Sequence, residues 1–112
     1  MDSLSLATVA DEQIAAARDT SSGRSATTVH GGHEHSLRQT VIALTAGHGL
    51  GEHDSPGEAT LQVLTGRVRL IAGDQSHEAS TGDYLIIPPV RHHLDAIEDS
   101  AVLLTVAVAG PQ

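Results

Sequence analysis

Short apolar runs at regular intervals fill the chain after residue 25. They are rich in Val, Ile, Leu and Thr, and Gly, Asp, Ser or Pro separates each run from the next. The runs cover residues 26–29, 37–44, 49–53, 59–64, 68–72, 76–79, 84–87, 93–97 and 101–109. Such spacing predicts an all-β sandwich or barrel. The intervals are too short for crossover helices, which excludes a parallel α/β sheet.

Turn residues and the last run refine this prediction. Thr65-Gly66 predicts a tight hairpin between the two runs that flank it, and Gly73-Asp74 predicts a further turn. Residues 101–109 form a long and nearly uncharged run. Such a strand would aggregate at an exposed sheet edge, so we expect it inside the sandwich.

The N-terminal part differs from the rest. Residues 4–18 are rich in Ala, with Val9 and Ile14 on one helical face, and predict a short helix. We expect this helix and a polar connector to form residues 1–24, and the β domain to form residues 25–112. The helix carries two carboxylates and one Arg, which favours a packing or dimer element over a nucleic-acid recognition helix.

Composition excludes several kinds of chemistry. The 112 residues hold fourteen acidic and six basic residues, with a formal charge of −8, no Cys and a single aromatic residue, Tyr84. All six basic residues are Arg. Disulfides, thiolate sites, Schiff bases and a P-loop lysine are therefore excluded, and neither nucleic acid nor an organic cofactor is expected as a partner. Eight His remain, which favours metal ligation or acid–base chemistry.

Membrane and export signals are not expected. No apolar run approaches the ~20 residues that a membrane span needs. The first residues have neither a basic segment nor a continuous apolar segment of the secretory type. We therefore expect a cytoplasmic protein without a membrane partner.

Gly47, His53, Gly66, Gly82 and Pro88 occur at intervals that resemble the two sequence motifs of a small single-domain cupin, over residues 47–106. The first motif of that family is a glycine, five residues, His-x-His, three or four residues, Glu, six residues and a glycine. Here Gly47 is followed by five residues and His53, and the segment closes on Gly66. The stretch from Gly82 to Pro88 matches the first half of the second motif. The resemblance implies a jelly-roll sandwich whose interior holds a metal bound by three His and one Glu.

The first motif departs from the family at two ligand positions. Its second His falls on Ser55 and its Glu falls on Ala59, while Glu58 lies one place earlier. A shift of one residue on a strand turns a side chain to the opposite face. Glu58 can therefore ligate a metal only if it lies in the bend before regular alternation begins.

The second motif leaves two candidates for its His. Val90 replaces the family glycine, and counting from Pro88 selects His93. Counting back along the following strand selects His92, because His92 then shares a face with Leu94. We prefer His92, since strand alternation is a physical constraint and loop length varies freely.

A further His-x-His lies upstream, at His33 and His35. In an extended segment both imidazoles point to one face, so either could complete a site with His53, His92 and Glu58. Such a set suits zinc, manganese, iron, nickel or copper. The alternative is a polar pair in a surface turn.

Other polar residues have simpler interpretations. We expect Arg67, Arg69 and Arg38 to pair with the many carboxylates, with capture of a carboxylate-bearing ligand as the alternative. Three histidines have no partner pattern and are expected to be exposed: His30, His48 and His77.

Three hypotheses of function are consistent with these residues. One is a non-enzymatic binding or sensor module, in which a cavity holds a divalent metal, a small ligand or both. The expected cavity residues are Leu61, Val63, Ile87 and Leu94. The alternative is a metal-dependent enzyme of the dioxygenase or isomerase type, acting on a small oxygen-bearing substrate. A metal-free cupin is a third hypothesis. For each we expect a homodimer that covers a sheet edge.

Overall fold

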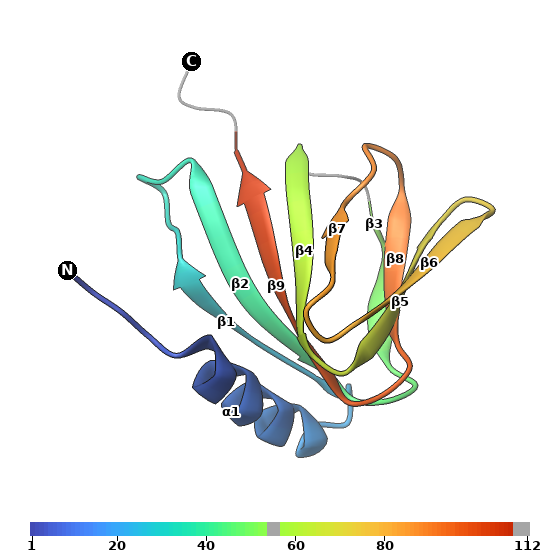
Figure 1. Cartoon of the computed structure of the whole chain (residues 1–112), viewed down its shortest axis with the longest axis horizontal. Helices are drawn as coiled ribbons and strands as arrows, with labels where there is room; N and C mark the ends of the chain where they lie inside the picture. Colours follow the sequence, from blue (N-terminus) through green and yellow to red (C-terminus); the bar gives the residue numbers. More distant parts are fainter. Residues whose placement is uncertain (54–56, 109–112) are drawn as a thin grey trace.

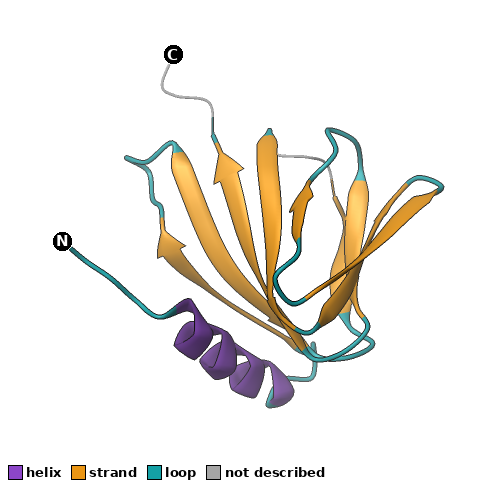
Figure 2. Cartoon of the chain, viewed as in Figure 1, coloured by secondary structure: helices purple, strands orange, loops and turns teal. Residues whose placement is uncertain are grey.

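Two antiparallel β-sheets face each other, and one helix packs against the outside of the larger sheet (Figure 1, Figure 2). This computed structural model describes residues 1–53 and 57–108, without the side chain of His53. The elements in chain order are α1 (Leu6–Arg18), β1 (Arg24–His30), β2 (Leu37–Leu44), β3 (Gly49–His53), β4 (Glu58–Thr65), β5 (Arg67–Ala72), β6 (Gln75–Ser80), β7 (Tyr84–Ile86), β8 (His92–Ala96) and β9 (Ser100–Ala107). Their positions agree with the predicted runs.

The strands form a five-stranded sheet in the order β1-β2-β9-β4-β7 and a four-stranded sheet in the order β3-β8-β5-β6. All the pairings described are antiparallel. β9 lies at the centre of the larger sheet and pairs along its length with β2 and β4. The predicted interior place of the last strand is therefore confirmed, and both of its ladder edges are satisfied within the fold.

The predicted hairpin at Thr65-Gly66 is wrong. β4 belongs to the larger sheet and β5 to the smaller one, so the chain turns a corner between the sheets at this point. Gly66 has φ +97°, and a Cβ there would collide with Ser100 Oγ. Ser100 is fully buried, and its Oγ accepts a hydrogen bond from the Arg67 N–H at 2.9 Å. A two-residue turn motif alone does not distinguish a hairpin from such a corner, because both need the same positive φ.

The main core lies between the sheets. It consists of small aliphatic side chains that interdigitate from the two inner faces. Its buried members are Ile42, Leu44, Ala59, Leu61, Val63, Val68, Leu70, Ala79, Ile87, Leu94, Ala96 and Val102. No ring contributes to it, so close approach of the sheets depends on many Val, Leu and Ala contacts.

Helix α1 covers the outer face of the larger sheet. Ser5 caps its N-terminus by accepting a hydrogen bond from the Thr8 N–H at 3.2 Å, so the helix begins two residues after the predicted start. Ala10, Ile14 and Ala17 form its buried stripe. Their buried partners on the sheet are Val41, Ala43, Ala101 and Leu103. No helix within the described ranges is long and apolar enough to cross a membrane.

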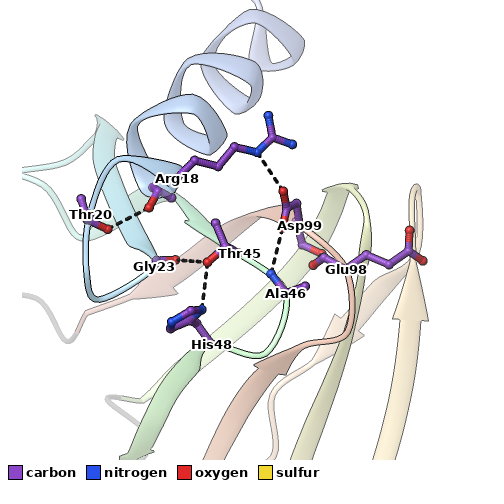
Figure 3. A network of polar contacts seen from close by, with 10 residues as sticks. Arg18, Thr20, Gly23, Thr45, Ala46, His48, Glu98 and Asp99 are labelled. Carbon is purple, nitrogen blue, oxygen red and sulfur yellow. Dashed lines mark hydrogen bonds and ion pairs between the residues drawn. The ribbon is translucent and has the colours of Figure 1, made fainter.

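A polar network joins α1 to two loops at the lower end of the sandwich in Figure 1 (Figure 3). Asp99 accepts hydrogen bonds from the Ala46 N–H at 2.9 Å and from Arg18 Nε at 2.8 Å. These two donors hold the pKa of Asp99 below its ordinary value, with the Ala46 N–H contributing most. The Gly47 N–H donates to the carbonyl of Ala96, the last residue of β8. The start of β8 therefore lies at the opposite, upper end.

Candidate functional site

β8 presents alternate side chains to the interior and to the solvent. His92 and Leu94 are each 3% exposed and face the interior, with Ala96 on the same side. His93 and Asp95 face outward, with 3.7 Å between His93 Nε2 and Asp95 Oδ2. Strand alternation thus turns His92, and not His93, toward the inner face, as the sequence analysis prefers.

The ring of His92 has a defined orientation. Its Nδ1 lies 2.8 Å from the carbonyl oxygen of Val90. Because a carbonyl only accepts, Nδ1 carries the hydrogen of this bond. A backbone carbonyl that fixes the tautomer in this way is typical of imidazoles that bind a metal or a ligand through the other nitrogen.

His53 is the nearest backbone partner of His92 on the neighbouring strand. The two residues are opposite each other in the β3–β8 pairing, after a register shift between Leu50 and His53. The side chain of His53 lies outside the described part of the structure. So does Ser55, where the resemblance predicts a family ligand.

Glu58 and Ala59 lie on opposite faces of β4. Regular alternation begins at Glu58, which is exposed, whereas Ala59 is 3% exposed and belongs to the main core. The condition for Glu58 to reach the interior, a place in the bend before the strand, is therefore not met. The inner-face position where the resemblance predicts a Glu ligand is therefore Ala59, which carries a methyl group instead of a carboxylate.

His33 and His35 lie in the loop between β1 and β2 and are exposed. The His35 N–H donates to the Gly32 carbonyl at 3.1 Å, which closes a turn with His33 at its corner. The ring of His35 makes an edge contact with that of His30, with 4.8 Å between centroids. His33 lines a pocket formed by β1, β2 and this loop, whose lining does not include His92. The structure thus does not bring this pair to His92.

The three remaining histidines are exposed, as predicted: His30, His48 and His77. The rings that could act in the interior are therefore fewer than the eight in the sequence. Among the side chains that the structure describes, no three His, Asp or Glu groups lie close enough together to hold a metal ion. The four-ligand set implied by the resemblance does not fit these residues.

A sequence model of the cupin domain matches residues 40–108, which is more than half of the chain. The chain belongs to the cupin family. No curated protein sequence matches this cupin significantly.

Solved structures share its fold. A conserved protein of unknown function from Streptococcus pyogenes superposes with a TM-score of 0.72 and 25% identity, over 82% of this chain and 80% of that one. An RmlC-like cupin from Desulfovibrio desulfuricans gives 0.65 and 27% identity, over 75% and 81% of the two chains. A mutant salicylate 1,2-dioxygenase from Pseudoaminobacter salicylatoxidans gives 0.71 and 18% identity, over 87% of this chain and 31% of the enzyme.

The four residues predicted to line a cavity differ in their surroundings. Leu61, Val63 and Leu94 are buried members of the main core, and none of them is in the lining of the pockets described here. Ile87 alone among the four predicted cavity residues also borders one of the described pockets.

Two pockets open where the sheets part. One of about 440 Å³ lies beside Ala59 at the upper end, and its lining is Gly57, Glu58, Ala59, Ile86, Ile87 and Pro89. Another of about 480 Å³ lies between the β5–β6 hairpin and β7, with the lining Leu70, Ala72, Gln75, Ser76, His77, Leu85, Ile86 and Pro88. The sequence feature that indicates both pockets is Pro88-Pro89, because prolines lack the N–H that would continue the hydrogen-bond ladder of β7.

The outer face of the smaller sheet is an ion-pair surface. Arg67 and Arg69 both bond to Glu78, at 2.7 Å and 2.6 Å. The hydrogen bonds from Arg69 and then Arg67 lower the pKa of Glu78. The predicted pairing of these two arginines with a carboxylate is confirmed. Arg38 differs, because it lines the pocket that contains His33.

Proposed function

We propose that this cupin is a non-enzymatic binding module that holds a small ligand at the upper end of the sandwich, with His92 as the main polar contact. The observation that carries the proposal is the buried imidazole of His92, whose orientation is set by the contact of Nδ1 with the Val90 carbonyl. A buried polar group at the edge of an apolar core orients a ligand and gives it specificity. The 440 Å³ pocket beside Ala59 lies at the same end of the sandwich, and its lining does not include His92 itself.

The proposal does not depend on a resident metal. With Ala59 in place of the family Glu, a divalent ion would have His92 and His53 as its protein ligands. Two imidazoles without a carboxylate hold such an ion weakly and exchangeably. The metal-dependent enzyme remains the alternative, and it needs the firm ligand set that Ala59 interrupts. The likeness to the salicylate dioxygenase, at 18% identity, supports the common fold only.

Ligand binding can be tested by following the ring resonances of His92 in labelled protein during a screen of small oxygen-bearing compounds. We expect at least one compound to shift these resonances saturably. In the His92→Gln variant that compound should no longer bind, whereas His93→Ala, a change on the opposite face of the same strand, should leave binding unchanged. Binding that survives His92→Gln would contradict the proposal, as would the failure of every compound at millimolar concentration. Chemical conversion of a bound compound would favour the enzyme instead.

A further inference from the structure

Arg38 is an unusual cation in this acidic chain. Four of the six arginines have carboxylate partners in the described residues: Arg18, Arg67, Arg69 and Arg91. Within the same part of the chain, no carboxylate lies within ion-pair distance of Arg38 or Arg24. Of these two arginines, Arg38 lines one of the described pockets and Arg24 lines none of them.

Arg38 lies on the inner face of the larger sheet. Its Cα pairs with Val106, whose side chain packs against the main core, and Ile42 lies on the same face of β2. Thr40 is on this face too, and Thr28 is opposite it on β1. Arg38 therefore lies on the same face of the larger sheet as the main core. It is near the end of β2 that the buried core residues do not reach.

Arg38, which is exposed, contributes to the lining of a pocket of about 330 Å³. The lining is Thr28, Gly31, Gly32, His33, Arg38 and Thr40, which includes no carboxylate. Gly31 lies beside the arginine stem and has φ +147°, a backbone conformation that L side chains rarely adopt. Two threonine hydroxyls and the ring of His33 add hydrogen-bonding groups. The volume is at the small end of the roughly 300–1,000 Å³ typical of ligand pockets.

We propose that this pocket binds the carboxylate group of a small monocarboxylate, with Arg38 as its anchor. A guanidinium matches a planar carboxylate through two parallel hydrogen bonds. The pocket holds a single arginine and the chain has a net charge of −8, so a multiply charged anion would be repelled more strongly than a monocarboxylate. The site lies in the larger sheet, shares no residue with the His92 site and does not depend on the function proposed for it.

The probe is sodium propionate, titrated into ¹⁵N-labelled full-length chain at constant ionic strength, with sodium chloride and inorganic phosphate in parallel. We expect propionate to shift the amide resonances of Gly31, Gly32 and Thr28 saturably, and phosphate to bind more weakly. Arg38→Gln should weaken propionate binding by about tenfold, the effect of one charge-assisted pair. Arg38→Lys keeps the charge but loses the planar fork, and it should also weaken binding.

The matched control is Arg24→Gln, which removes the same charge at the other end of β1 and should leave propionate affinity unchanged. An equal effect of the two glutamine variants would overturn the proposal, because it would show a non-specific charge effect. The same conclusion follows if chloride reproduces the shifts, if phosphate binds more tightly than propionate, or if Arg38→Lys binds like the wild type. His92→Gln should not affect this titration, so the two proposed sites fail or succeed separately.

Discussion

Replacing Ala59 with Glu tests whether a single missing carboxylate explains the incomplete ligand set. Ala59 is 3% exposed on the inner face of β4, with Leu61 on the same face and the Ile87 N–H bonded to its carbonyl at 3.0 Å. A carboxylate at this position enters apolar surroundings. Without a metal ion we expect Ala59→Glu to lower the free energy of unfolding by about 2–4 kcal/mol, the range for a buried polar group that lacks partners.

Metal should reverse this loss. The new carboxylate would add an oxygen ligand to the two imidazoles, and a metal ion at a concentration of 100 Kd stabilises the native state by about 2.7 kcal/mol. The assay is urea denaturation with excess zinc and with a chelator. Thr60→Glu, which adds the same group to the outer face of β4, is the control. We expect zinc to restore most of the stability lost in Ala59→Glu and to leave Thr60→Glu unchanged.

Two results would refute this reasoning. If Ala59→Glu gains no more stability from zinc than Thr60→Glu, position 59 does not face a site that can hold metal. If the wild-type chain itself gains as much from zinc as Ala59→Glu does, the existing residues already form a complete metal site.

Three further predictions concern the fold. Ser100→Ala should lower the free energy of unfolding by about 1–3 kcal/mol, measured by urea denaturation, because it leaves the partly buried Arg67 N–H without its acceptor; an unchanged stability would contradict this role. The lowered pKa of Asp99 contributes stability that is present above its ordinary value of 3.8 and is lost as the pH falls through the lower folded-state value. Asp99→Asn should therefore flatten the acid limb of the stability–pH curve, and an unaltered limb would contradict the assignment. We also predict a homodimer, because β7 is a sheet edge that leaves Tyr84 and Ile86 exposed; light scattering that gives a monomer mass at micromolar concentration would contradict it.

The strand positions were predictable from the sequence because short apolar runs are separated by Gly, Asp, Ser or Pro. The alternation of side chains along a strand turns His92 inward and separates Ala59 from Glu58. These inferences hold because a strand has a side-chain period of two residues, whatever its partners are. A local sequence pattern is therefore sufficient to predict which face of the sheet a side chain lies on.

The pairing of the strands and the packing of the two sheets could not be predicted from local sequence patterns in the same way. Thr65-Gly66 predicts a hairpin, but the chain turns a corner there because Ser100, distant in sequence, bonds to Arg67. The volume of the predicted apolar cavity depends on how closely the two sheets approach, which local patterns do not give. The pocket around Arg38 requires β1, β2 and their loop to fold together, and the sequence shows these only as separate segments.

The central claim is that His92 lies in the interior of this cupin and that the described residues do not supply a complete set of metal ligands around it. The most direct test is the metal content of the chain, purified without an affinity tag, incubated separately with zinc, manganese, iron, nickel and copper, and then desalted. We predict far less than one ion per chain for each metal. One tightly retained ion per chain, lost in His92→Gln and kept in His93→Ala, would contradict the claim.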